Sequence, residues 1–358
     1  MENQIQLNKF SLIGYFLSEI GLGQTIRNFA YALQSENIPA NYVNAHLQGR
    51  SNDLEFHGQR TPYEAGNINF VVAGINDAGM FFDQFKKLGL GRKNVIYPLW
   101  ELDRVPHELI NSLNLYDEVI APSQFIADTL SIHLNKNIKK IPHPIKIPSS
   151  VQPNKIKDGI LKIYSFMDLD SYYERKNPLG VLEAFSAAFP VQYRDVELIL
   201  KVRGVNLVSR DELHAFSSKD NRIKIIDKTL SRIEVDVLMS ECNVFLSMHR
   251  SEGFGLGPAE ALLSEKIVGA TNYGGTTDFI DVNTGFPVDY KMVPIKPRQY
   301  PYWYNQLWAD PSIESAASAL RFIYNNFDEA QRRAIYGRNL MLDQHSYKVV
   351  ANKMRLLL

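Results

Sequence analysis

The sequence predicts an α/β protein of two domains, each built around a parallel β-sheet. The chain has 358 residues, and at about 100–200 residues per domain this length provides for two hydrophobic cores. Short apolar runs of strand length alternate with longer stretches of helical periodicity, which is typical of βα units. The alternation occurs on both sides of residues 141–158, a segment with four prolines and no periodic pattern. We therefore place the domain boundary near residue 150.

The first domain, residues 1–150, begins with an apolar run at 10–16 that is short enough for a strand. A helical pattern follows at 23–36, where apolar side chains recur on one face at Ile26, Phe29 and Leu33. Further apolar runs of strand length lie at residues 68–73, 94–99 and 118–121.

The second domain, residues 151–340, repeats this pattern. Its expected strands are 161–166, 196–202, 222–226, 244–247 and 267–270, and its expected helices include 178–188 and 234–242. Residues 286–311 are rich in proline and aromatic side chains and too long for an ordinary connection, which indicates a functional loop. Two helical patterns, 312–325 and 328–358, end the chain.

Charge and composition exclude several classes of protein. The 39 Lys and Arg residues balance 39 Asp and Glu residues, and 45% of the chain is hydrophobic. A disordered chain would have less apolar content or more net charge, and a protein that binds a nucleic acid backbone usually has a basic excess. Cys242 is the only cysteine, which excludes an intramolecular disulfide and a cysteine-based zinc site.

The sequence also bears on cellular location. No apolar stretch approaches the roughly 18–20 residues of a membrane span, and the first residues lack the basic and apolar regions of a signal peptide. We therefore expect a cytoplasmic protein. Peripheral contact with the inner face of the membrane stays open, although the balanced charge gives no strong electrostatic signal for it.

The segment 244–270 holds the most informative pattern in the chain. A strand ends near Ser247, glycines follow at positions 253, 255 and 257, and Pro258 stands where a helix would begin. Such a turn directs free backbone N–H groups and the positive end of the helix dipole at one place, which favours a phosphate. Glu252 and Glu260 flank the turn and could grip different parts of one ligand. The alternative is that Glu252 is a turn residue and that Glu260 only offsets the helix dipole.

The pair Glu252-x7-Glu260 within SEGFGLGPAEALL resembles the signature of retaining glycosyltransferases of the GT-B fold, family 4. The resemblance extends over nearly the whole chain, through GLGQTIRNFAYAL, YPLWELDRVP, VIAPSQFIADTL, ERKNPLGVLEAFSAAF, LILKVRG and ATNYGGTTDF. It implies two Rossmann-like domains whose parallel sheets face each other across a cleft. A nucleotide sugar would bind mainly to the C-terminal domain, and the final helix, about 341–358, would cross back to the N-terminal, acceptor-side domain.

The resemblance assigns roles to single residues of the second domain. Glu260 would bind the ribose hydroxyls of the donor, Glu252 the hydroxyls of the transferred sugar, and Lys176 would neutralise the diphosphate. The backbone of the turn would lie against sugar and diphosphate, at Gly253, Phe254, Gly255 and Leu256. Many relatives carry an arginine five or six residues before the lysine, where this chain has Asp170 and Ser171. The candidates for the missing positive charge are Arg175, Lys201 and Arg203.

Further candidate residues border these positions. His249 and Arg250 come just before the turn and are candidate ligands, with packing or capping as the alternative for the histidine. In the first domain, Gly21 and Gly23 form a turn before a helix whose N-terminus would face the diphosphate. Glu101 lies in WELDRVP after an expected strand, in a region where many relatives have a histidine. We expect Glu101 in the acceptor site or in catalysis, with a helix N-terminal carboxylate as the alternative.

The implied reaction is the transfer of a hexose from a nucleoside diphosphate sugar to a hydroxyl of a saccharide or lipid-linked glycan, as in polysaccharide biosynthesis. Both GDP and UDP donors fit, and mannose is our first guess for the sugar. Retention is expected through front-face attack, which requires no protein nucleophile. We expect neither a metal nor a cofactor, because GT-B enzymes use no metal at this place, although Asp168 and Asp170 form a D-x-D pair.

Other function classes fit the sequence less well. A dinucleotide-dependent oxidoreductase would need a third glycine after Gly21-x-Gly23, and no P-loop motif for nucleotide hydrolysis occurs. A non-catalytic nucleotide-sugar-binding subunit of a glycosyltransferase complex stays open as the alternative function.

Overall fold

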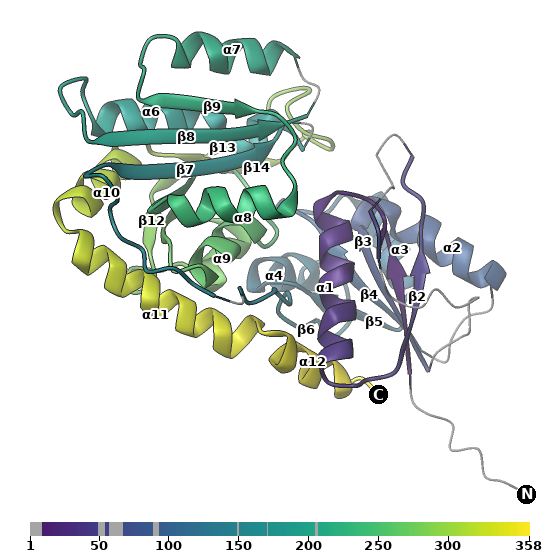
Figure 1. Cartoon of the computed structure of the whole chain (residues 1–358). Coiled ribbons are helices and arrows are strands. Elements are labelled where there is room, and N and C mark those ends of the chain that lie inside the picture. The colour runs from purple at the N-terminus through teal and green to yellow at the C-terminus, as the bar shows by residue number, and fades with distance from the viewer. Residues whose placement is uncertain are drawn as a thin grey trace, which may run out of the picture. The chain divides into compact units, whose positions relative to one another are not determined.

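The protein is described by a computed structural model that covers residues 9–48, 54–56, 67–88, 93–148, 150–169, 171–204 and 207–358 (Figure 1). The chain divides into two compact units. The first contains Met1–Lys146 together with Asp343–Leu358, and the second contains Ile147–Leu342. The C-terminal residues therefore belong to the first unit.

The first unit is built on a six-stranded sheet in the order β2-β1-β3-β4-β5-β6, and all of its pairings are parallel. The strands are β1 (Phe10–Gly14), β2 (Ala40–Asn44), β3 (Ile68–Gly74), β4 (Lys93–Leu99), β5 (Glu118–Ala121) and β6 (Lys139–Lys140). Every residue of β1 and β3 is buried, as expected of central strands that are covered on both faces. The helices are α1 (Gly21–Ser35), α2 (Ala78–Leu88), α3 (His107–Asn114), α4 (Gln124–Ser131) and α12 (Tyr347–Arg355).

The last helix of the chain packs against the first one. Val350 and Met354 of α12 are fully buried in the same core as Phe29 of α1, and the Tyr347 hydroxyl donates to Asn28 Oδ1 over 3.0 Å. Figure 1 shows α12, in yellow, beside the purple α1.

The expectation of one helix over residues 328–358 was wrong. The segment forms two helices, α11 (Phe327–His345) and α12, and Ser346 between them has an extended backbone. Tertiary hydrogen bonds hold this break, because the His345 carbonyl accepts from the Ile145 N–H and the His345 ring donates to the His143 carbonyl, both over 2.9 Å.

The second unit has a six-stranded parallel sheet in the order β12-β11-β10-β7-β8-β9. Its strands are β7 (Leu161–Asp168), β8 (Val196–Arg203), β9 (Ile223–Asp227), β10 (Val244–Ser247), β11 (Ile267–Thr271) and β12 (Phe286–Val288). Its helices are α5 (Tyr173–Lys176), α6 (Pro178–Ala188), α7 (Leu207–Ser217), α8 (Arg232–Glu241), α9 (Leu256–Leu263), α10 (Ile313–Asn325) and α11. Val181 and Phe185 of α6 share one buried core with Leu320 of α10 and with the strands. The α/β class predicted from the sequence is confirmed.

Residues 286–311, expected as a loop, contain strands as well. After β12 the chain forms an antiparallel pair, β13 (Tyr290–Pro294) and β14 (Leu307–Pro311). Four of the five residues of β13 are exposed, so no apolar run marks the strand in the sequence.

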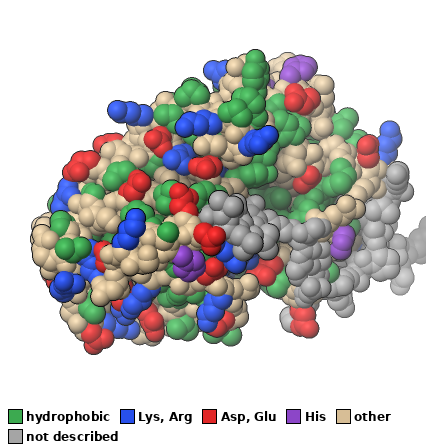
Figure 2. All heavy atoms as spheres, turned by 90° about the horizontal axis from the view of Figure 1, so that it is seen from above, with side chains coloured by type: hydrophobic (Ala, Val, Ile, Leu, Met, Phe, Trp, Pro, Cys, Tyr) green, Lys and Arg blue, Asp and Glu red, His purple; other side chains and the backbone are tan. Residues whose placement is uncertain are grey.

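The surface reflects the balanced composition. Lys and Arg side chains lie interspersed with Asp and Glu on the face shown in Figure 2. Among the helices of the described residues, none has the length and hydrophobicity needed to cross a membrane.

Candidate active site

The order of the second sheet defines where a ligand site is expected. β7 and β10 are the two central strands and pair with each other. After β7 the chain continues to β8 on one side, and after β10 it continues to β11 on the opposite side. Ligands of open α/β sheets bind outside the carboxyl ends of the strands at such a switch point. α5 follows β7 and the glycine-rich turn follows β10. The sheet therefore brings Lys176 and Glu252, which are 76 residues apart in the sequence, to one place.

Glu252 lies between two cations. Arg175 Nη1 is 3.2 Å from Glu252 Oε2, and Lys176 Nζ donates to Glu252 Oε1. Two further hydrogen bonds position Arg175, because its guanidinium donates to the Ser251 carbonyl over 2.9 Å and to Ser171 Oγ over 2.9 Å. The side chain of Arg175 is 3% exposed and that of Glu252 is 15% exposed, so the ion pair is largely shielded from water.

The charge of Glu252 follows from these neighbours. Burial alone would raise its pKa, but Lys176 and Arg175 outweigh burial and lower the pKa to about 2. Glu252 is therefore ionised at neutral pH and accepts hydrogen bonds only. Two cations therefore face one carboxylate at this point.

The turn after Glu252 leads into α9. Gly255 is the N-cap of this helix with φ of +95°, and no side chain caps the first turn. A Cβ on Gly255 would lie 2.5 Å from Thr276 Cγ2, so glycine is required both by the backbone conformation and by the space. The first N–H groups and the positive end of the α9 dipole favour an anion here.

A second glycine loop supports the first. Gly274, with φ of +83°, and Gly275 lie against the backbone of Glu252 and Gly253, and the Gly275 N–H donates to the Glu252 carbonyl over 2.7 Å. The rings of Phe254 and Phe279 are 5.3 Å apart. The loop that begins at Asn272 therefore holds the backbone of the turn in place.

His249 connects these two loops. Its Nε2 donates to the Tyr273 carbonyl over 3.1 Å, and its Nδ1 accepts from Ser247 Oγ over 3.0 Å. The ring is fully buried, and burial lowers its pKa to about 4. His249 is thus a neutral side chain whose two nitrogens both bind the protein, which fits the packing alternative.

The Arg250 side chain contacts β14 of the β13–β14 hairpin. Its Nε is 3.0 Å from Asp310 Oδ1, its Nη1 donates to the Glu174 carbonyl over 2.6 Å, and its guanidinium lies 5.7 Å from the Trp308 ring centre. Arg250 therefore ties α5 to β14.

Glu260, on α9, has a partner that the sequence did not reveal. Arg232 Nη1, at the start of α8, is 2.9 Å from Glu260 Oε1, and Arg232 Nε is 2.9 Å from Asp236 Oδ1. Burial would lower the pKa of Arg232, but Glu260 and Asp236 raise it. The capping box Ser231-x-x-Glu234 marks the helix start in the sequence, whereas the ion pair across two helices leaves no sequence signal.

The remaining candidate cations lie on β8. Arg203 binds Asp168, with Nη2 3.0 Å and Nε 3.2 Å from Asp168 Oδ2, and Lys201 is buried. Asp168 of the D-x-D pair is thus engaged by an arginine, and Asp170 lies outside the described residues. Of the three candidates for the missing positive charge, Arg175 is the one that contacts Glu252.

In the first unit, the glycine turn lies at the start of α1. A Cβ on Gly23 would lie 2.2 Å from the Ser18 carbonyl oxygen, whereas one on Gly21 would meet nothing within 4 Å. Arg27 is buried and donates to the Phe16 and Ser18 carbonyls over 2.7 and 3.1 Å. Arg27 therefore binds the backbone of the segment that leads into α1.

The switch point of the first sheet carries a residue that the sequence analysis missed. β1 lies between β2 and β3, and the Tyr15 hydroxyl after β1 donates to Asp77 Oδ2 after β3 over 3.1 Å. Burial raises the pKa of Asp77. The available signal was an aspartate three residues beyond a mainly apolar strand. Glu101, half-buried, lies between β4 and α3.

Three buried histidines predict a pH-dependent stability. Burial lowers the pKa of His143 to about 3 and that of His249 and His345 to about 4. Below pH 6.5 the unfolded chain binds protons that the folded protein does not, so the free energy of unfolding should fall from pH 6.5 toward pH 4. Each histidine contributes up to about 1.4 kcal/mol per pH unit in this window. Urea unfolding at pH 7, 6 and 5 measures the slope, and His249→Gln should reduce it. An equal midpoint at pH 7 and 5 would contradict this expectation.

Comparisons with known proteins agree on the fold. No protein-family model matches the chain, and no curated protein sequence does. HepE from Anabaena, solved in complex with UDP and glucose, superposes with a TM-score of 0.69 at 13% identity over 98% of each chain. Sucrose-phosphate synthase from Thermosynechococcus elongatus gives 0.70 at 14% identity over 98% of each chain. The lipopolysaccharide outer core galactosyltransferase WaaB gives 0.67 at 11% identity over 98% of this chain and 99% of its own. The expected GT-B fold is confirmed.

Proposed function

We propose that this GT-B chain is a retaining glycosyltransferase that moves a hexose from a nucleoside diphosphate sugar to a hydroxyl of a saccharide or lipid-linked glycan. The observation that carries the proposal is the cluster of Glu252, Arg175 and Lys176 beside the N-terminus of α9, at the switch point of the second sheet. The fold likeness to the galactosyltransferase WaaB and to HepE, which was solved in complex with UDP-glucose, supports it.

The site suits the parts of a nucleotide sugar. The cationic side chains of Arg175 and Lys176 and the N–H groups of α9 fit the diphosphate. Glu252 is an acceptor-only carboxylate that fits sugar hydroxyls, and Glu260, positioned by Arg232, fits the hydroxyls of the ribose.

Catalysis at this site would be mainly electrostatic. The bond between the anomeric carbon and the diphosphate oxygen breaks, so positive charge develops on the sugar and negative charge on the leaving group. Arg175, Lys176 and the α9 N–H groups are already in place and would stabilise the leaving diphosphate. The ionised Glu252 would favour the positive sugar ring. The acceptor oxygen forms the new bond on the same face, and its proton passes to the leaving phosphate oxygen, so no protein nucleophile takes part.

 The order in which donors are tested follows from the neighbours and from the sequence. HepE was solved in complex with UDP and with UDP-glucose, so UDP-glucose is the first donor to test. GDP-mannose is the second, because the Asn272-Tyr273-Gly274-Gly275 loop resembles that of bacterial mannosyltransferases. The proposal includes neither a metal nor a cofactor.

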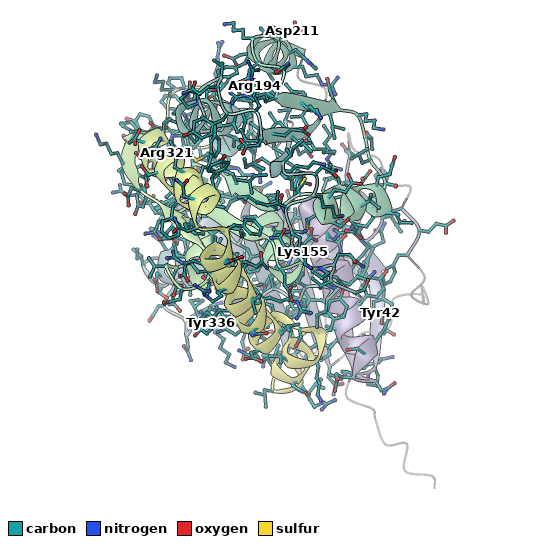
Figure 3. The ribbon with its side chains drawn as sticks, turned by 60° about the vertical axis from the view of Figure 1, so that its left-hand side comes forward. Tyr42, Lys155, Arg194, Asp211, Arg321 and Tyr336 are labelled. Carbon is teal, nitrogen blue, oxygen red and sulfur yellow. The ribbon has the colours of Figure 1, made fainter. Side chains whose placement is uncertain are left out.

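Thermal unfolding in the presence of nucleotides tests the donor site. A ligand at about 100 times its dissociation constant adds about 2.7 kcal/mol of stability, so UDP, UDP-glucose, GDP or GDP-mannose should raise the Tm of the wild-type protein. Lys176→Met should reduce the shift. Lys155→Met, which removes an exposed lysine of the same unit (Figure 3), is the matched control. No shift with any of the four ligands contradicts the proposal, and a shift without sugar transfer favours the non-catalytic subunit.

A further inference from the structure

The β13–β14 hairpin concentrates aromatic side chains. Six lie between residues 290 and 308, at Tyr290, Tyr300, Tyr302, Trp303, Tyr304 and Trp308. The same stretch has three basic residues and no acidic one, in a chain whose total charge is zero. We call β13, β14 and residues 295–306 between them the aromatic hairpin.

The base of the aromatic hairpin is firmly anchored. Tyr300 is buried, and its ring centre lies 4.7 Å from that of Tyr172 and 6.5 Å from that of Trp308. The Ile295 N–H donates to the Gln306 carbonyl over 3.0 Å, which closes the connection. On the other side, the Ala309 N–H donates to the Arg250 carbonyl over 3.0 Å. The base of the hairpin is therefore held in place before any ligand binds, which lowers the entropic cost of binding.

The aromatic hairpin is continuous with the proposed donor site. Tyr172 precedes α5, and its carbonyl accepts from the Lys176 N–H over 3.1 Å. Tyr172 therefore lies one helical turn before the lysine that binds Glu252. The Arg250 guanidinium contacts the Trp308 ring, and the Arg250 backbone N–H donates to the Arg175 carbonyl over 2.8 Å. Arg250 therefore connects the hairpin to α5. The contacts thus run from Glu252 through α5 to the hairpin. Glu260, on the ribose side, takes no part in them.

Several of these rings are exposed although burial would stabilise the fold. Tyr172 is 43% exposed, Tyr302 37% and Tyr304 72%, and the Trp303 ring lies edge-on to Tyr304 at 5.8 Å. Tyr172 and Tyr302 also have positive φ angles of 63° and 56°, which large side chains rarely adopt. These two tyrosines combine a strained backbone with an exposed aromatic ring, and both features are typical of binding sites.

We propose that this surface of the second unit binds part of the saccharide acceptor of the reaction, in addition to the acceptor side that the sequence resemblance implies for the first domain. This inference rests on the proposed function. The acceptor surface consists of Tyr172, Tyr302, Trp303 and Tyr304. Flat rings present an apolar face to the C–H face of a sugar ring, while tyrosine hydroxyls reach the sugar hydroxyls. The contact of Tyr172 with Tyr300 joins this surface to α5, which carries Lys176 of the proposed donor site.

A membrane is the competing partner, because basic and aromatic side chains also occur together at lipid interfaces. The exposed large side chains of the hairpin are tyrosines apart from Met292, and a surface that inserts into lipid would carry more aliphatic side chains. The observations therefore favour the saccharide.

Saturation-transfer NMR on the full-length protein tests the proposal without nucleotide. The probes are gluco-, manno- and galacto-oligosaccharides and one uronate oligosaccharide. Wild-type protein should bind at least one of them, and Tyr304→Ala should bind it about tenfold more weakly. Tyr336→Ala removes a ring of α11 that is 57% exposed (Figure 3), and this matched control should bind like the wild type. UDP affinity, measured by calorimetry, should be the same in all three proteins.

Equal saccharide affinity in Tyr304→Ala and wild type overturns the proposal, and so does a wild-type protein that binds no probe. Weaker binding of Tyr304→Ala to phosphatidylglycerol vesicles, with unchanged saccharide affinity, assigns the surface to a membrane and also overturns it. A wild-type protein that binds neither UDP nor GDP contradicts the proposed function alone, because the saccharide measurement does not use a nucleotide.

Discussion

Glu252→Gln should lower the transfer rate at saturating donor by about tenfold to a hundredfold. The substitution keeps the size of the side chain but removes the charge that lies between Arg175 and Lys176. A hydrogen bond to a charged group contributes about 1.5–3 kcal/mol, which corresponds to that range of rates. The variant also leaves the buried Arg175 without its carboxylate, so its free energy of unfolding should fall.

Release of nucleoside diphosphate from the donor found by thermal shift measures this rate. Circular dichroism at the assay temperature shows whether the variant is folded. Glu183→Gln, which changes an exposed glutamate on α6, is the matched control and should keep the wild-type rate. A folded Glu252→Gln with turnover within twofold of the wild type would remove Glu252 from the mechanism.

Gly275→Ala should abolish nucleotide binding and destabilise the second unit. The added Cβ would lie 2.2 Å from the Gly253 carbonyl oxygen and 2.5 Å from the carbonyl carbon. Both are backbone atoms, so the turn that holds Glu252 must move. Forcing extra atoms into a filled site costs about 1–3 kcal/mol, and a shifted turn no longer directs its N–H groups at the diphosphate.

Calorimetric titration with the nucleotide and urea unfolding measure the two effects. Gly79→Ala makes the same chemical change where the nearest atom is Ser112 Oγ at 2.9 Å, the end of a side chain that can rotate. This control should keep its nucleotide affinity. If Gly275→Ala binds nucleotide as the wild type does, the second glycine loop does not support the donor site.

The sequence predicts the central strands well because their side chains are buried on both faces of a parallel sheet. The expected strands 118–121 and 244–247 agree with β5 and β10, and the expected helix 178–188 agrees with α6. β13 and β6 were missed because they are mainly exposed and have no apolar run. The break at Ser346 depends on tertiary hydrogen bonds of His345, which local periodicity does not contain.

The candidate site was only partly visible in the sequence. Glycines 253 and 255 with Glu252 and Glu260 form a local pattern, so the turn and its helix could be predicted. Their ion partners come from other strands and helices, and the sheet order decides which of them meet. Arg175 at Glu252 and Arg232 at Glu260 therefore emerged only from the structure. Tyr15 and Asp77 join two strands of the first sheet in the same way.

Hydrogen–deuterium exchange with and without nucleotide tests the location of the donor site most directly. When UDP or GDP binds, we expect slower exchange of the backbone N–H groups of residues 253–257, at the start of α9, and little change in the aromatic hairpin. Nucleotide binding that leaves residues 253–257 unprotected and protects another segment would contradict the donor site at Glu252 and α9.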